Sequence, residues 1–397
     1  MDKRINSQTG VKMESTIQTE SLKELFYWFH KNPEIAYQEF NTTKKIREIL
    51  EENSVEILDL NLETGLVAII RGAHPGPVIA LRGDIDALPI TEDTGLEYSS
   101  RNIGVMHACG HDFHTTVILG TALELEKKKN QMCGTVKVIF QPAEETAGGA
   151  EKIVKTNVLE DVTHIWGIHS TPALPTGAVG ISEGAVMAAA DRFTIEIKGK
   201  GSHAAYPQEG IDPIVIAATI IQELQILISR IKNPFSPAVI SVTHFESGNT
   251  WNVIPETAFL EGTVRTLRPE DRELLQNKIQ SIVLKTSEIF DAKGTFNWFP
   301  GSPAVINDSK MTEFARKIAK NQNLQIEEAE KALGGEDFSL YLPGRKGAFL
   351  RIGTSGEYAS HHPKFTVDPQ AINSAVSFMS EIAVTTLQQL ALNNTLE

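Results

Sequence analysis

Short apolar runs, each followed by polar residues, occur in the first part of the chain and return near its end. They lie at 76–81, 135–140, 164–168 and 347–353. A helical period over about 112–129 separates the first two runs, and further helices are expected to open near Ser21 and to cover about 42–52. Because buried apolar runs that alternate with helices are typical of parallel sheets, they predict an α/β domain with a mostly parallel sheet.

The middle of the chain has a different pattern, in which polar and apolar positions alternate, as in DRFTIEIKGK. Alternation with a period of two indicates strands with one exposed face. The expected order is β-α-β-β-α-β, the split pattern of ferredoxin-like α+β domains. These elements occupy 191–200, 213–230, 236–245, 256–266, 269–290 and 294–299.

We therefore expect residues 188–300 to form a smaller domain that is inserted into a larger one. The larger domain then consists of 19–187 and 301–397. Residues 1–18 lack the apolar segment of a secretory signal, and we expect them to be a disordered extension.

Composition narrows the possible partners and compartments. The 397 residues exceed what one hydrophobic core usually serves. A net charge of −13 argues against nucleic acid or an anionic membrane as partner. The apolar stretch 214–228 is interrupted by polar residues, and we expect it to be too short and too polar to span a bilayer. Two cysteines, Cys109 and Cys133, make no disulfide framework and fit a reducing, cytoplasmic location.

Side chains that bind transition metals follow the apolar runs or lie in the loop that opens the next helix. They are Cys109, His111, Glu144, Glu145, His169 and His361. Residues beyond the carboxyl ends of parallel strands share one rim. Thiolate, imidazole and carboxylate are natural ligands of zinc and of its neighbours in the transition series. The spacing therefore predicts a metal site at this rim.

Two local features add to this prediction. Gly110 lets the backbone turn, so that the side chains on both sides of it can face one ion. Glu144 and Glu145 would point apart if their backbone were extended. One could then bind metal while the other takes a proton from a bound water whose pKa the metal lowers.

Each of these residues has a simpler interpretation when it is taken alone. His169 could be a loop or core residue, and the adjacent glutamates could be solvated surface. Cys109 could be a small buried hydrophobe, or a nucleophilic or redox-active cysteine, which would need a base and an exposed thiolate. The joint occurrence of all six residues favours a metal site.

Nine short motifs, taken together, carry a resemblance to one enzyme family. They are RGDIDALP, MHACGHDFH, QPAEE, GIHSTP, GSHAAYP, NVIP, GTVRT, GGEDF and HHPKF. The sequence resembles the di-metal amidohydrolases of the aminoacylase/carboxypeptidase G clan. Within that clan it is similar to hippurate hydrolases, N-acyl-amino-acid amidohydrolases and indole-acetyl-amino-acid hydrolases. The resemblance covers nearly the whole chain after about residue 20. It implies a metallopeptidase-like catalytic domain with a lid domain that is often used for dimerisation.

The resemblance also implies roles for particular residues. Glu144 matches the general base. His361 is preferred over His362 because the family's ligand lies two residues before a proline, here Pro363. The metals would be two divalent ions, Zn²⁺ or Mn²⁺, with Co²⁺ or Ni²⁺ as alternatives. The positions that match the family's metal ligands are Cys109, His111, Glu145, His169 and His361.

Substrate-binding roles are implied mainly for the lid. His203 matches a histidine that reaches the scissile carbonyl oxygen across a dimer. Asn252 and Arg265 match residues that hold the substrate's carboxylate or carbonyl, although Arg265 could instead form a structural ion pair on its strand. Gly335 lies in a motif that the family has at the substrate pocket. Asp86 is expected to hydrogen-bond a metal ligand or a bound water and so to orient it.

Four residues keep open roles at this stage. Asp84 could support the site in the same way as Asp86, or merely pair with the adjacent arginine. His107 and His114 could support the metal ligands from behind or be structural, and His362 could be a neighbouring pocket residue or a surface residue.

The expected function is hydrolysis of the amide bond of N-acyl amino acids of the acetyl, benzoyl or indole-acetyl type. The alternatives are a dipeptidase or aminopeptidase that uses the same site, and a non-catalytic amino-acid-binding relative. The expected partners are a small-molecule substrate and a second copy of the chain, in a homodimer or a higher homo-oligomer.

Overall fold

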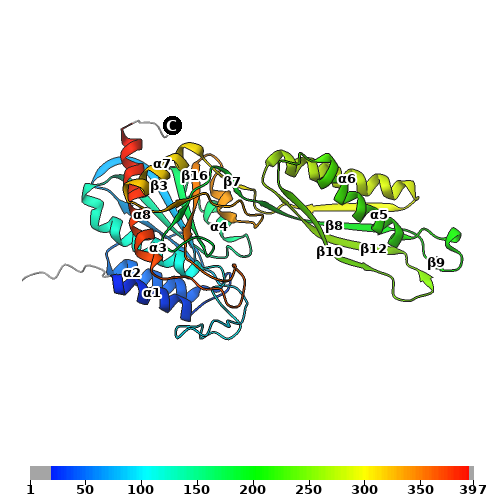
Figure 1. The fold of residues 1–397 in the computed structure, drawn as a ribbon, viewed down its shortest axis with the longest axis horizontal. Helices are drawn as coiled ribbons and strands as arrows, with labels where there is room; N and C mark the ends of the chain where they lie inside the picture. Colours follow the sequence, from blue (N-terminus) through cyan, green and yellow to red (C-terminus); the bar gives the residue numbers. More distant parts are fainter. Residues whose placement is uncertain (1–18, 393–397) are drawn as a thin grey trace, which may run out of the picture.

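The computed structural model describes residues 19–392 and shows two bodies joined by extended segments (Figure 1). The larger body contains both ends of the described chain. The smaller body is formed by residues 189–299 and projects to one side. The extension expected at 1–18 lies outside the described residues.

An eight-stranded sheet forms the larger body, in the order β1-β2-β4-β3-β5-β16-β6-β15. Its centre, β4-β3-β5-β16, is parallel throughout, whereas β1, β2 and β6 each run antiparallel to a neighbour. The four central strands are β3 (His74–Asp84), β4 (Cys133–Gln141), β5 (Val162–Thr171) and β16 (Lys346–Gly353). The outer strands are β1 (Glu56–Ile57), β2 (Leu66–Arg71), β6 (Val179–Gly180) and β15 (Ile326–Glu327). The four predicted apolar runs thus form adjacent parallel strands, which confirms the α/β fold class.

Helices cover both faces of this sheet (Figure 1). They are α1 (Thr19–Lys31), α2 (Phe40–Glu52), α3 (His111–Lys128), α4 (Gly149–Lys155), α7 (Ser309–Asn321) and α8 (Ala371–Ala391). Helix α3 is buried along most of its length because α1, α8 and β3 all pack against it. Thr116 donates to the carbonyl of Asp112 within the helix at 2.7 Å, and Thr115 donates to the carbonyl of Asp84 at the end of β3 at 3.1 Å. The first turn of α3 is therefore held rigidly at the sheet edge where the candidate ligands lie.

The smaller body is a four-stranded antiparallel sheet, β10-β12-β8-β13, covered by α5 and α6. Its elements are β8 (Ala189–Lys198), α5 (Pro213–Ile226), β10 (Ala238–Ser247), β12 (Thr257–Thr266), α6 (Pro269–Ile289) and β13 (Lys293–Phe299). Their order is the predicted β-α-β-β-α-β. Phe193, Ile195 and Ile197 are buried on one face of β8, as the alternation predicted. The exact domain boundaries at 188 and 300 stay a prediction.

Two small two-stranded sheets complete the fold. They pair β9 (Ser202–His203) with β11 (Val253–Ile254), and β7 (Gly184–Met187) with β14 (Val305–Asn307). The β9–β11 pair lies at the end of the smaller body that is farthest from the large sheet (Figure 1).

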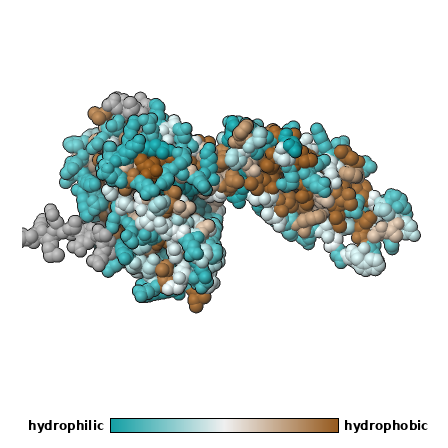
Figure 2. Space-filling view, viewed as in Figure 1, coloured by the Kyte–Doolittle hydropathy of each residue, from teal (hydrophilic) through white to brown (hydrophobic). Residues whose placement is uncertain are grey.

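Helix α5 leaves much of its apolar surface uncovered. With the π-helical turn that follows, it spans residues 213–231 and is long and apolar enough to cross a membrane by length and composition alone, contrary to the sequence-based expectation. Its inner face, however, packs on the sheet through Ile216, Ile220 and Leu224. Val215 and Ile226 are about half exposed, and hydrophobic side chains are prominent over this body (Figure 2).

Candidate active site

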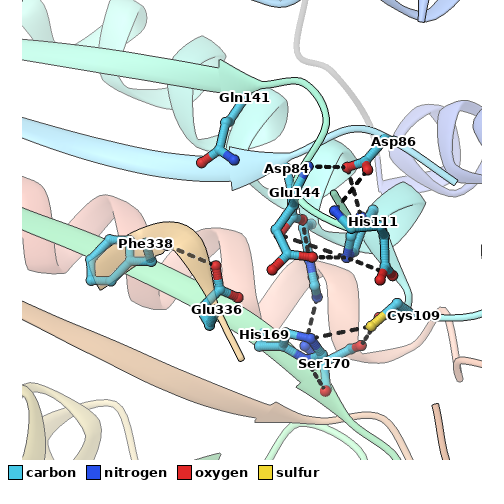
Figure 3. Close-up of polar contacts among 12 residues, drawn as sticks. Asp84, Asp86, Cys109, His111, Gln141, Glu144, His169, Ser170, Glu336 and Phe338 are labelled. Carbon is cyan, nitrogen blue, oxygen red and sulfur yellow. Dashed lines mark hydrogen bonds and ion pairs between the residues drawn. The ribbon is translucent and has the colours of Figure 1, made fainter. Parts of the chain in front are cut away.

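The predicted metal ligands come together at one edge of the large sheet (Figure 3). One ligand atom from each of Cys109, His111 and His169 lies within 4.8 Å of the other two. A second such group contains Cys109, Glu145 and His361. Cys109 thus belongs to both groups, an arrangement that can serve two neighbouring ions.

Gly110 makes this arrangement possible. Its φ of +83° is in the left-handed region, and a Cβ at this position would lie 2.3 Å from Ser170 Oγ. Both the conformation and the lack of space exclude other residues. The turn sends Cys109 toward His169, with 3.5 Å between Sγ and Nε2, while His111 begins α3.

Hydrogen bonds fix His169 in the form that a metal ligand requires. Its Nδ1–H donates to the backbone carbonyl of Ser170 at 2.6 Å, so Nε2 keeps its lone pair and faces Cys109. Burial, followed by the charges of His114 and Arg351, holds the pKa of His169 well below its ordinary value. The ring is therefore neutral and able to bind metal.

The two adjacent glutamates point to the same side, which differs from the expectation for an extended chain. The backbone turns at Ala143, where φ is +53°, and residues 144–147 form a turn. The N–H groups of Glu144 and Glu145 donate to the two oxygens of Asp86, each at 3.0 Å. As a result, Glu144 Oε2 and Glu145 Oε1 each lie 3.9 Å from His111 Nε2.

Two buried atoms at the centre have no hydrogen-bond partner. They are His111 Nε2 and Glu145 Oε1, which face one another across 3.9 Å; the nearest charged contact of Glu145 Oε1 is His361 Nε2, at an ion-pair distance of 3.4 Å. Buried polar atoms are almost always paired, and an imidazole nitrogen opposite a carboxylate oxygen can bind a divalent cation when the ring gives up its proton. These residues therefore fit a bound metal.

His361 reaches the same place from a distant segment. Its φ is +69°, and its backbone N–H donates to the carbonyl of Ala108 at 2.7 Å. Its Nε2 lies 3.4 Å from Glu145 Oε1. The nearby Cys109 thiol, and then the Glu145 carboxylate, raise the pKa of His361 to about 10 in the metal-free protein.

Asp84 is fully buried beside the site, and its Oδ2 lies 3.7 Å from His111 Nε2. Arg82 donates to Asp84 at 2.7 Å, which confirms the pairing that the sequence left open. His114 donates through Nδ1 to Asp84 at 2.5 Å and accepts from the N–H of Ser170 at 2.7 Å through Nε2. Both ring nitrogens of His114 are thus occupied, so His114 has no nitrogen left for a metal ion.

Arg82 is also the centre of a buried acidic cluster beside Glu144. Besides Asp84, it donates to Glu336 and Asp337, each at 2.9 Å. Burial, and then the negative charges of Glu336 and Asp337, raise the pKa of Glu144 well above its ordinary value. The surroundings thus favour proton uptake by Glu144, whereas a nearby metal ion would act in the opposite direction.

A cleft of about 1100 Å³ opens from these ligands toward the smaller body. Arg265 and Gly335, both predicted to contact substrate, line it together with Glu144. Within the described part of the chain, no ion pair involves Arg265. The alternative interpretation, in which Arg265 forms a structural ion pair on its strand, is therefore not supported.

Four other residues considered in the sequence lie outside this cleft. His203, on β9, and Asn252, just before β11, do not line it. His107 is buried with both ring nitrogens unpartnered. His362 stacks on Tyr358, with ring centroids 4.4 Å apart.

The model of peptidase family M20/M25/M40 matches residues 80–385. The chain belongs to this family. It is 46% identical over 362 residues to N-acetylcysteine deacetylase of Bacillus subtilis, covering 91% of this chain and 95% of that protein. It is 36% identical over 355 residues to N-acetyldiaminopimelate deacetylase of the same species, covering 88% and 94%.

A solved M20 structure shares the whole architecture. It is a dinuclear metal-binding peptidase from Bacillus subtilis, 43% identical, with a TM-score of 0.86 over 93% of this chain and 98% of that one. The membership confirms the resemblance read from the motifs, and both the neighbour and the ligand groups support two divalent metal ions.

The structure of this M20 protein also shows residues that the motifs did not single out. Glu39 accepts the N–H of Ala143 at 2.8 Å and so helps to hold the glutamate turn. Arg351 lies buried in the wall of the cleft. An arginine in the apolar run GAFLRIG was the signal that could have pointed to it, because charged residues are seldom buried in a sheet without a reason.

Proposed function

We propose that this M20 protein hydrolyses the amide bond of N-acyl amino acids with two divalent metal ions. The observation that carries the proposal is the pair of unpartnered atoms, His111 Nε2 and Glu145 Oε1, at the head of the cleft. The two deacetylases named above are both named for N-acetylated amino acids, and this supports the substrate class.

We take as metal ligands the residues of the two groups that share Cys109. Their soft sulfur and imidazole donors suit Zn²⁺, while the carboxylate admits Mn²⁺, with Co²⁺ or Ni²⁺ as alternatives. When bound, the ions would supply Lewis acidity to the acyl carbonyl and lower the pKa of a water molecule. The proposed ligands are Cys109, His111, Glu145, His169 and His361.

Glu144 is the proposed general base. Its carboxylate borders the cleft, and the hydrogen bond from its backbone to Asp86 fixes its position. It takes a proton from the attacking water and passes it to the leaving amine, which typically contributes ~10²–10⁴-fold to the rate. Asp86 positions both glutamates by accepting their N–H groups.

His203 is the proposed donor to the oxyanion of the tetrahedral intermediate. Its Nδ1 accepts the N–H of Ala205 at 3.0 Å, so the neutral ring carries its proton on Nε2, which can donate. One such hydrogen bond is worth ~2.7–4 kcal/mol in the transition state. Because His203 and Asn252 do not line the cleft of their own chain, they would have to act in the cleft of a second copy.

A second copy is proposed to pack on the smaller body. Strand β10 is an edge of its sheet, and α5 beside it exposes Val215 and Ile226 (Figure 2). Exposed edges and contiguous apolar surface favour association. The proposed state is a homodimer, or a higher oligomer built from it. The cytoplasm is the proposed location, because both cysteines are free and Cys109 is needed as a metal ligand.

Metal analysis combined with a substrate panel tests the proposed function. The panel contains acetyl-, benzoyl- and indole-acetyl-amino acids together with dipeptides. We expect two bound divalent ions per chain and turnover of acyl amino acids that is lost on chelation and in Glu144→Gln. Turnover of dipeptides alone would assign the same site to a peptidase, and metal-free protein with full activity would contradict the proposal.

Mixed dimers test the shared site. In a dimer of Glu144→Gln with His203→Ala, one of the two clefts has both an intact base and an intact donor from its neighbour. If His203 acts across the dimer, random mixing of these inactive variants restores about a quarter of the wild-type activity. If His203 acts within its own chain, mixing restores none.

A further inference from the structure

A buried arginine in the cleft has no acidic partner. Arg351 on β16 is 8% exposed and lines the cleft. No carboxylate of residues 19–392 lies within ion-pair distance of its guanidinium, which donates to Met187 Sδ and lies 5.4 Å from the centre of the Phe349 ring, while Glu336 and Cys109 act on it only from beyond that distance. Arg82, which is fully buried, shows the contrast, because it is paired with three carboxylates.

This difference points to a ligand. Burying a guanidinium without an anion is strongly unfavourable, since the desolvation of the charge is not offset by an attraction. Carboxylates of the protein itself balance the charge of Arg82, whereas none is paired with Arg351. A carboxylate bound in the cleft would supply the missing partner, and the planar guanidinium is suited to bind one in a bidentate manner.

The position of Arg351 places that carboxylate near the reacting bond. Arg351 is in register with His169 on the neighbouring parallel strand, so both side chains leave the same face of the sheet. Arg265 approaches the same wall from the smaller body. A Cβ at Gly335 would lie 3.4 Å from Arg265 Nη1, and one at Gly334 would lie 3.4 Å from Met187, the contact of Arg351. Arg265 and the Met187 contact of Arg351 thus lie beside two adjacent glycines, and all four residues, together with Arg351, line the cleft.

We propose that Arg351 binds a second carboxylate of the substrate, in addition to the one assigned to Arg265. The cleft would then prefer N-acyl amino acids that carry two carboxylates. The second carboxylate would come either from an acidic amino-acid side chain or from a dicarboxylic acyl group. This inference rests on the proposed function and names the substrate class of the same cleft.

Two matched substrate pairs test the inference and distinguish the two sources. N-acetyl-glutamate is compared with N-acetyl-glutamine, and N-succinyl-methionine with N-butyryl-methionine. In at least one pair, we expect the wild type to prefer the charged member. We expect Arg351→Met to lower kcat/KM for that member roughly 30-fold or more, and for the neutral member by less than about threefold. Arg351→Lys should retain part of the preference, and Arg71→Met, which removes an exposed arginine on β2, should retain all of it.

The remaining outcomes separate this inference from the proposed function. Turnover of the neutral substrates without preference for either charged one would overturn the role of Arg351 and leave the amidohydrolase intact. An equal loss on all four substrates in Arg351→Met would also overturn it. Absence of turnover of any acyl amino acid would instead refute the proposed function.

A measurement on the wild type alone covers the case in which Arg351→Met does not fold. Glutarate should inhibit hydrolysis of N-acetyl-methionine at lower concentration than butyrate does. Equal inhibition by the two acids would contradict a second carboxylate site.

Discussion

Replacing Asp86 with asparagine tests how the two glutamates are positioned. The carboxylate of Asp86 accepts one N–H from Glu144 and one from Glu145, each at 3.0 Å, and its Oδ1 lies 3.3 Å from His111 Nδ1. Asparagine has almost the same shape but keeps one acceptor oxygen and presents an NH₂ group in place of the other. One of the two backbone N–H groups would therefore face a donor.

The magnitude follows from these bonds. A hydrogen bond to a charged acceptor contributes ~1.5–3 kcal/mol, and a buried donor left unsatisfied costs ~1–3 kcal/mol. We expect Asp86→Asn to lower the free energy of unfolding by ~2–4 kcal/mol, since one bond is lost and the other is weakened. Because the turn carries both the proposed base and a proposed ligand, metal affinity and kcat/KM should each fall ~10–100-fold.

Chemical denaturation, titration with metal and steady-state kinetics measure the three effects on one protein sample. Asp93→Asn is the matched control, because Asp93 is exposed and pairs only loosely with Lys364 across 3.7 Å. The control should change stability by less than ~0.5 kcal/mol. If Asp86→Asn bound metal and turned over substrate like the wild type, the reasoning about the turn would be refuted, whatever the change in stability.

Three further substitutions probe separate parts of the account. Glu144→Gln should keep both metals while kcat falls ~10²–10⁴-fold, as metal analysis beside kinetics would show; normal turnover would remove Glu144 as base. Gly110→Ala should lower the free energy of unfolding by more than ~1 kcal/mol and weaken metal binding, because its φ is +83°; unchanged metal affinity would contradict the role of the turn. Burial lowers the pKa of His30, but Asp112 and Glu92 outweigh it and raise that pKa to about 9. A pKa that is higher in the folded state than the unfolded value near 6.5 stabilises the folded protein at low pH. The wild type should therefore be more stable than His30→Gln by ~3 kcal/mol near pH 6, and this difference should vanish as pH rises through 9. A difference that grows with pH would contradict the role of His30.

The sequence predicted the centre of the fold well because the central strands carry a strong signal. Each is a run of apolar residues buried on both faces, and such runs stand out without any tertiary information. The two-residue strands β1, β6 and β15 have no period to read. The amphipathic helix α7 did have a helical period and was missed.

The glutamate turn shows what the sequence could not predict. A positive φ at Ala143 is rare for a residue with a Cβ, and it is held by Glu39 and Asp86, which lie about 104 and 57 positions away in the chain. Without those distant acceptors, an extended conformation was the reasonable expectation for Glu144 and Glu145. The ligand types were readable because metal chemistry restricts them, whereas the pairing of Arg82 and the isolation of Arg351 depend on which side chains meet.

Anomalous scattering from crystals loaded with Zn²⁺ or Mn²⁺ tests the central claim most directly. We predict two peaks at the head of the cleft, with ligand distances of ~2.0–2.3 Å and the side chains of Cys109, His111, Glu145, His169 and His361 as ligands. A single peak, or peaks that these residues do not contact, would contradict the account.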